Sequence, residues 1–221
     1  MNSIFRKSML SVAGLVMSGG VVAGPAVAAH AAPAHAKPVV ADKGNGKGNG
    51  KGADKSERSA GYEYEAQPNY FYCGPASTRI ALSAEGKEVS QDELAKQLGT
   101  TENGTDSAID ITRVLNEHTG GKYKTTEIRD DVATKDQIER LRVDVKAAVD
   151  QGRPVVANVL GSALDIDGAA HSYPGHYLTV VEYKNDGNTV LIADPASPNE
   201  PTYWMGVTDL ANWIAGRGYS S

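Results

Sequence analysis

The chain has 221 residues, of which 22 are Lys or Arg and 27 are Asp or Glu, and its formal net charge at pH 7 is −5. It contains one cysteine, so no disulfide can form within the chain. Residues 61–221 carry 14 basic and 24 acidic side chains, a balance that argues against nucleic-acid binding and for solubility outside a cell.

Residues 1–36 are predicted to be a secretory signal peptide. Two basic residues precede an apolar stretch over residues 9–22, and Ala-x-Ala patterns follow. We expect cleavage between residues 28 and 36, preferably after Ala28 or Ala31, and a secreted, extracellular protein. The alternative is a membrane anchor, but the apolar run is short and contains Ser and Gly. We expect no membrane span after the signal is removed.

Residues 37–60 are predicted to be a flexible linker. They contain a Gly/Lys/Asn repeat over residues 43–52, which has no apolar side chain to bury. A short propeptide is the alternative. The remainder, residues 61–221, is long enough for one domain with its own core.

The first half of that domain is predicted to be helical. Residues 74–84 form a helix that ends before Gly86. Ser90, followed three residues later by Glu93, predicts a capping box at the start of a second helix. The apolar spacing of residues 109–115 indicates a third helix.

The second half is predicted to consist mainly of strands. A short strand over residues 122–128 precedes the longest helix, residues 134–150, whose apolar side chains recur at helical spacing. Residues 154–160 then read as a buried strand. Two further strands, residues 176–183 and 189–194, flank an Asn-Asp-Gly turn and predict a hairpin.

The hairpin brings a histidine and an aspartate to the same end of one apolar face. A hairpin centred on Asn185 pairs Val180 with Val190, Leu178 with Ile192 and His176 with Asp194. The turn type does not determine this register. The alternation nevertheless predicts that the carboxylate can orient the imidazole.

Cys73 is predicted to be a nucleophile. It precedes Gly74-Pro75 at the start of the first helix, where backbone N–H groups and the helix dipole favour the thiolate. A free thiol is also a liability in an oxidising compartment unless it has a function. The alternative is a buried small apolar residue, which is the usual role of a lone cysteine.

A thiol, an imidazole and a carboxylate are together the groups of nucleophilic acyl transfer. The oxyanion of that reaction needs hydrogen-bond donors. The backbone N–H of Cys73 and the side-chain amide of Gln67 are the candidates. The residues alone leave open that His176 only ends a strand and that Asp194 only begins a turn.

Four short motifs occur in order along the domain: Gln67, Cys73-Gly74-Pro75-Ala76, Gly175-His176-Tyr177 and Asp194-Pro195. In this order and spacing they resemble the papain-fold cysteine peptidases of the bacteriocin-leader-peptidase-like (double-glycine peptidase-like) superfamily, most closely its secreted actinobacterial branch. The similarity extends to Leu98-Gly99-Thr100-Thr101, Gly104-Thr105, His171-Ser172-Tyr173-Pro174-Gly175 and Tyr203-Trp204-Met205.

The resemblance implies an α+β, papain-like fold. Its N-terminal helical half carries the cysteine, its C-terminal twisted antiparallel sheet carries the histidine and the aspartate, and the active-site cleft lies between them. By the same resemblance Cys73 is the nucleophile, His176 the base, Asp194 the orienting carboxylate and Gln67 the oxyanion glutamine. His171 is the second candidate for the base, and we expect it in a loop near the cleft.

The sequence therefore predicts a secreted cysteine peptidase that hydrolyses peptide bonds. Two alternatives remain: a cysteine-dependent amidase or acyltransferase acting on cell-wall peptides or small amides, and a non-catalytic binding domain with a vestigial triad. We expect a monomer whose partner is a peptide or protein substrate, with no nucleic acid and no cofactor. One cysteine and scattered histidines form no zinc pattern, and Asp165 and Asp167 indicate a turn rather than a calcium loop.

Overall fold

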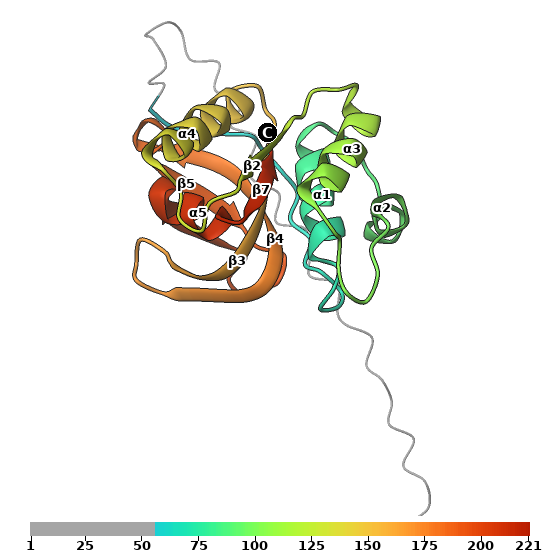
Figure 1. Cartoon of the computed structure of the whole chain (residues 1–221). Helices are drawn as coiled ribbons and strands as arrows, with labels where there is room; N and C mark the ends of the chain where they lie inside the picture. The colour runs from blue at the N-terminus through green and yellow to red at the C-terminus, as the bar shows by residue number, and fades with distance from the viewer. Residues whose placement is uncertain (1–55) are drawn as a thin grey trace, which may run out of the picture. The chain divides into compact units, whose positions relative to one another are not determined.

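A computed structural model describes residues 56–221, so the expected signal peptide and most of the expected linker lie outside the described residues. Helices dominate the first half of this part and strands the second (Figure 1). The elements are, in chain order, β1 (Arg58–Ser59), α1 (Cys73–Ala84), α2 (Gln91–Leu98), α3 (Ala108–Thr119), β2 (Thr125–Ile128), α4 (Lys135–Val149), β3 (Val155–Leu164), β4 (Ala170–Lys184), η1 (Asn185–Gly187), β5 (Thr189–Ala193), β6 (Thr202–Gly206), α5 (Val207–Ile214) and β7 (Arg217–Ser220). The predicted α+β class is confirmed.

The strands form one antiparallel sheet of seven strands, six of which follow the order β2-β7-β3-β4-β5-β6. The short strand β1 also pairs with β4, through Arg58 opposite Tyr183. Arg58 and Ser59 were assigned to the linker from the sequence, so the sheet includes residues just before the expected domain boundary. A strand of two residues is too short to show an alternation of apolar and polar side chains, so β1 could not be recognised in the sequence.

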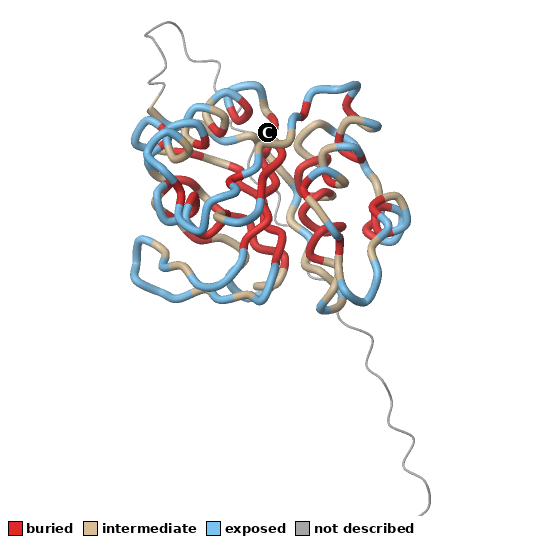
Figure 2. The backbone as a smooth tube through the Cα atoms, in the orientation of Figure 1, coloured by how far each residue is buried: buried red, intermediate tan, exposed pale blue. Residues whose placement is uncertain are grey.

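Helices cover the sheet from both sides and create separate cores. One buried cluster joins α4 and α5 to the central strands and includes Leu141, Leu178, Ile192 and Trp213. A second lies among α1, α2 and α3 and reaches the sheet at Val156 and Tyr177. Buried backbone is concentrated in α1 and the central strands (Figure 2). The cleft between a helical half and a sheet half follows from this arrangement.

Local capping groups explain why the helices begin and end where the sequence predicts. The Ser90 side chain accepts a hydrogen bond from the Glu93 backbone N–H, and Gly99 ends α2 in the left-handed conformation. Thr134 and Gln137 form a reciprocal capping box at the start of α4. These positions depend on neighbours within a few residues, which is why the sequence suffices to predict them.

The register predicted for the hairpin of β4 and β5 is wrong by two residues. Val180 lies opposite Ile192 rather than Val190, and Thr179 lies opposite Ala193. The turn is a single 3-10 turn in which Asn185 and Asp186 have positive φ. The pairing also shifts by one residue within β4, between Val180 and Glu182. A shift of two residues leaves each side chain on its original face.

The C-terminal segment was not predicted from the sequence. The strand β6, the helix α5 and the strand β7, which pairs with both β2 and β3, lie between residues 202 and 220. The helix α5 has only eight residues, and its N-cap Gly206 provides no side-chain hydrogen bond. Its buried Trp213 and Leu210 pack in the core shared with α4, so tertiary packing rather than local signals stabilises it.

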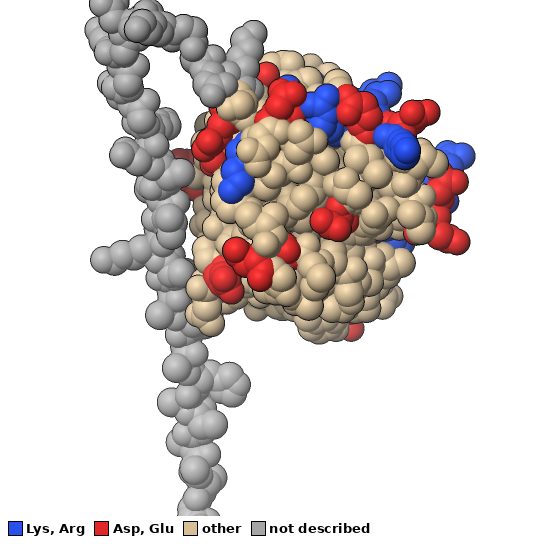
Figure 3. Space-filling model, turned by 90° about the vertical axis from the view of Figure 1, so that its left-hand side faces the viewer, with Lys and Arg blue, Asp and Glu red and all other residues tan. Residues whose placement is uncertain are grey.

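The surface over α4 carries charges of both signs. Arg140 contacts Asp144, and Arg142 contacts Glu139, both within the helix. On the face seen in Figure 3, acidic and basic side chains are interleaved near the upper edge, and much of the lower part is uncharged. Among residues 56–221 no helix is long and apolar enough to cross a membrane.

Candidate active site

Cys73 is the first residue of α1 and is 7 % exposed. The first N–H groups of a helix have no carbonyl partner within it, so the backbone at Cys73 offers donors close to the sulfur. Gly74, directly after it, is required by close packing: a Cβ there would overlap the Thr105 side chain. The segment before α3 can therefore approach the nucleophile candidate closely.

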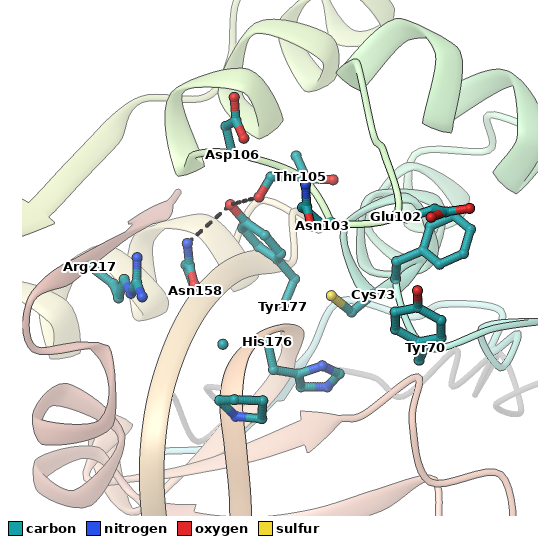
Figure 4. Close-up of a pocket in the computed structure, with 14 residues that line it drawn as sticks. Tyr70, Cys73, Glu102, Asn103, Thr105, Asp106, Asn158, His176, Tyr177 and Arg217 are labelled. Atoms are coloured by element: carbon teal, nitrogen blue, oxygen red, sulfur yellow. Dashed lines mark hydrogen bonds between the residues drawn. The ribbon is translucent and has the colours of Figure 1, made fainter.

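His176 lies in β4 and Asp194 directly follows β5, and the two side chains meet. His176 Nε2 is 2.8 Å from Asp194 Oδ1, and the two side chains are 3 % and 0 % exposed. An ionised carboxylate can only accept, so His176 Nε2–H is the donor. Because Nε2 is bound to Asp194, Nδ1 is the ring nitrogen left to contact Cys73. The His176 ring and Cys73 lie next to each other in the wall of the cleft (Figure 4).

The surroundings shift the pKa values of all three groups. Burial alone raises the pKa of the Cys73 thiol, but hydrogen bonding to His176, the positive charge of His176 and two backbone N–H groups together lower it below its ordinary value. Burial lowers the pKa of His176, but hydrogen bonds to Asp194 and Cys73 outweigh burial and raise it to about 9. Near neutral pH these shifts favour a thiolate beside an imidazolium.

The carboxyl of Asp194 is kept ionised. Burial alone raises its pKa, and the hydrogen bond and charge of His176, with further donors from Ala196 N–H and the Tyr173 hydroxyl, bring the pKa below its ordinary value. The fully buried carboxylate is thus held by hydrogen bonds and by one cationic partner.

A bulge in β4 aims the His176 side chain. Val159 lies opposite His176 and Gly161 opposite Tyr173, so β4 has one extra residue in the segment Pro174-Gly175. Gly175 has φ +145°, which side-chain-bearing residues rarely adopt. The extra residue places Tyr173 and His176, three positions apart, against each other, with ring centroids at 4.0 Å. A Pro-Gly pair inside a strand is the sequence signal for such a bulge.

The sulfur faces an open cavity of about 360 Å³. Figure 4 shows Tyr70 on one side of Cys73 and Asn158, Tyr177 and Arg217 on the other. The Tyr177 hydroxyl accepts from Asn158 Nδ2 at 3.0 Å and donates to the Thr105 carbonyl at 3.3 Å. These bonds join the sheet to the helical half across the cleft floor.

A second cavity, of about 210 Å³, adjoins the first and shares Asp106, Asn158 and Arg217 with it. The two form one groove leading from Cys73 towards β2 and the start of α3. A substrate with an extended chain fits such a groove.

The Peptidase_C39 like family model matches residues 60–220 of this chain. The chain belongs to this family. The same family and its fold support a cysteine peptidase, in agreement with a thiol and an imidazole facing a cleft. A search among curated proteins finds no match.

One solved structure shares the fold, and two others are similar with lower scores. A C39-like peptidase from Bacillus anthracis has a TM-score of 0.52 and 15 % sequence identity, over 74 % of this chain and 96 % of that one. The peptidase domain of Streptococcus ComA, a bifunctional ABC transporter, has a TM-score of 0.48 and 20 % identity, over 72 % and 96 %. A double glycine motif protease solved with its leader peptide has a TM-score of 0.46 and 14 % identity, over 73 % and 91 %.

Gln67 lies near the site but not in the wall of the cavity. Its backbone N–H donates to the Pro195 carbonyl at 2.9 Å, next to Asp194. Its side-chain Nε2 donates to the Asn69 carbonyl at 2.7 Å, and its Oε1 is buried with no hydrogen-bond partner among the described residues. This family member thus has Gln67 beside the triad candidates, and its oxyanion role stays a prediction.

His171, the second candidate for the base, does not line the cavity that Cys73 faces. It lies within β4, opposite Ala163, and not in a loop as expected from the sequence. Its Nε2 is 3.0 Å from Asp165 Oδ2, and its ring stacks on Tyr203 with centroids at 3.7 Å. Asp165 Oδ1 accepts from two backbone N–H groups of the turn that joins β3 to β4. The expectation of a turn here, rather than a calcium loop, agrees with this geometry.

Proposed function

We propose that this protein is a secreted cysteine peptidase that hydrolyses peptide bonds with Cys73, His176 and Asp194. The observation that carries the proposal is the linear arrangement of the three side chains: Asp194 Oδ1 binds His176 Nε2 at 2.8 Å, and the ring's other edge serves Cys73 in an open cavity. Thiol, imidazole and carboxylate in this relation are the groups of covalent acyl transfer.

The first half of the reaction forms an acyl-enzyme. The Cys73 thiolate attacks the carbonyl carbon of the scissile bond, a C–S bond forms, and the carbonyl electrons move onto oxygen. The Cys73 backbone N–H and the Gln67 amide are the proposed donors to that oxygen. When the C–N bond breaks, the His176 imidazolium gives its proton to the departing amine.

The second half releases the acid. A water molecule gives a proton to the now neutral His176 and attacks the thioester carbonyl. The C–S bond breaks, the carboxylic acid leaves, and the thiolate and imidazolium are restored. Asp194 takes no proton in either half, because its role is to hold the ring and to stabilise its positive charge.

The cleft also supports a preference among substrates. Arg217 lines both cavities, and its guanidinium makes no hydrogen bond or ion pair with any residue of the described chain. Arg129, in the second cavity, is paired with Glu127 at 2.6 Å. We expect the free guanidinium to favour peptides that carry a carboxylate a few residues from the scissile bond.

The test is cleavage of a peptide library by the protein purified from culture medium, read by mass spectrometry. New termini should appear with the wild-type protein and be absent with the Cys73→Ala variant and after treatment with iodoacetamide. Acidic residues should be enriched at one position, and this enrichment should be lost with Arg217→Ala but kept with the matched variant Arg129→Ala.

Other results would contradict the proposal. Cleavage by Cys73→Ala would exclude a thiol mechanism, and products joined to an added amine would indicate an acyltransferase. Secretion is tested by the N-terminus of the protein in the medium, which should begin between residues 29 and 37. Retention of the whole chain in cells would contradict export.

A further inference from the structure

The Asp194 carboxylate is surrounded by donors on both of its oxygens. Oδ1 accepts from His176 Nε2 at 2.8 Å and from the Ala196 backbone N–H at 3.0 Å. Oδ2 accepts from the Tyr173 hydroxyl at 2.8 Å and from the Tyr203 hydroxyl at 3.0 Å. The side chain therefore cannot rotate without breaking bonds at both oxygens.

Tyr173 contacts two members of the proposed triad. Its hydroxyl holds Asp194, and its ring stacks on the His176 ring at 4.0 Å with an interplanar angle of 25°. The bulge at Pro174-Gly175 makes both contacts possible, because it brings residues three positions apart onto the same side of β4. One side chain thus limits the rotation of both the imidazole and the carboxylate.

Tyr203 is itself held by the second His–Asp pair. On β6 its ring stacks on His171 at 3.7 Å, and His171 is bound by Asp165 at 3.0 Å. The ring of Trp213 lies beside this group, 6.0 Å from Tyr173 and 6.4 Å from His171. His171, Tyr173 and Tyr203 meet here, and none of the three lines the cavity that Cys73 faces.

We propose that Tyr173 and Tyr203 are positioning residues that hold Asp194 so that His176 faces Cys73. The proposal rests on the proposed function of the triad. The hydroxyls are neutral, so they stabilise the buried anion without competing with the imidazolium for its charge. No Lys or Arg among residues 56–221 forms an ion pair with Asp194, and His176 is its one cationic partner there.

Variants lacking the hydroxyls test this. Tyr173→Phe and Tyr203→Phe each remove one donor to Oδ2 and keep the ring, and the double variant removes both. Tyr173→Leu also removes the stacking ring. The matched control is Tyr219→Phe, because the Tyr219 hydroxyl donates to Asp144 at 2.8 Å, in the core and away from the cleft. Three measurements are compared: kcat and KM on a cleaved peptide, the rate of iodoacetamide labelling at pH 6.5, and Tm.

Each single Phe variant should lower kcat about tenfold and the double variant about 100-fold, the range expected for hydrogen bonds to a charged group. KM should stay within about twofold, because neither side chain lines the cleft. Labelling of Cys73 should slow severalfold in the double variant, and Tyr173→Leu should be more affected than Tyr173→Phe. The control should match wild type in kcat and in labelling.

Unchanged kcat and labelling in the double variant would overturn the proposal and leave the hydroxyls as groups that only satisfy a buried carboxylate. A loss that merely follows Tm, in the control as in the others, would overturn it too. Labelling needs no substrate, so this readout decides the role of the tyrosines even if the protein cleaves no peptide. Failure of the proposed function would instead appear as cleavage by Cys73→Ala.

Discussion

Two His–Asp pairs lie in the same sheet, and only one of them has a thiol beside its imidazole. His176 binds Asp194 at 2.8 Å, and His171 binds Asp165 at 3.0 Å, so the hydrogen bonds alone do not distinguish them. Their neighbours do. The His176 imidazole is hydrogen-bonded to the Cys73 thiol at an open cavity, whereas the His171 imidazole is stacked on Tyr203.

The carboxylates differ as well. Asp194 has two tyrosine hydroxyls on the oxygen that His176 does not use, and its side chain is fully buried. In Asp165 the oxygen that does not contact His171, Oδ1, accepts hydrogen bonds from two backbone N–H groups of its own turn. The His171–Asp165 pair therefore stabilises a turn, whereas the His176–Asp194 pair lies beside the thiol that we propose as the nucleophile.

The largest expected difference between the pairs is in turnover. His176→Ala should lower kcat/KM about 10³-fold, the size of a lost general acid–base. His171→Ala should change it less than about fivefold, because its ring contacts Tyr203 and Trp213 rather than the three triad side chains. Both variants are assayed on the same peptide, with Tm as the check on folding. Equal losses, or a larger loss in His171→Ala, would show that the two pairs have been assigned the wrong way round.

Gln67 sharpens the comparison, because only the His176 pair has a candidate oxyanion donor nearby. Gln67→Ala should lower kcat about 10²-fold, while iodoacetamide labelling of Cys73 stays at the wild-type rate. One amide hydrogen bonds to the Asn69 carbonyl, so we expect the second one to bind the oxyanion. If labelling slows in parallel with turnover, Gln67 only orders the loop before the nucleophile.

The pH dependence follows from the raised pKa of His176 and the lowered pKa of Cys73. A raised His pKa means that the imidazolium, and the stability it contributes, persists at neutral pH and is lost as pH rises through about 9. Activity should therefore fall above pH 9, to about one tenth of its maximum near pH 10. Labelling of Cys73 should begin below the pH of an ordinary thiol. A kcat/KM profile that still rises between pH 9 and 10 would contradict the ion pair.

The smallest change in kcat is expected when the carboxylates of Asp194 and Asp165 are compared. Asp194→Asn should keep the fold and lower kcat about tenfold, since Oδ1 still accepts from His176 while the new amide meets two tyrosine oxygens that can accept. It should lose less activity than Cys73→Ala. Asp165→Asn is the matched control and should stay within about twofold of wild type. Loss in Asp194→Asn as complete as in Cys73→Ala, with Tm unchanged, would mean that the charge itself is indispensable.

Helix boundaries and chemical groups could be predicted from the sequence. The N-caps Ser90 and Thr134 act within one helical turn, and Cys73, His176 and Asp194 stand out by residue type and spacing. The predicted hairpin register was wrong by two residues. The turn and the irregularity between Val180 and Glu182 add unpaired residues, and the alternation of apolar side chains does not reveal how many. His176 and Asp194 still meet, because an even shift preserves the face of each side chain.

The linear sequence by itself determined which groups are available for catalysis and, through local capping and periodicity, where α1 to α4 lie. The sequence already favoured His176 over His171, but only the tertiary structure decided how each ring is held, because that depends on the bulge in β4 and on what packs against each ring. The same holds for Tyr173 and Tyr203, 30 positions apart in the chain, whose hydroxyls converge on one oxygen of Asp194. Contacts between distant strands come from the packing of the whole sheet, and no short pattern in the sequence encodes them.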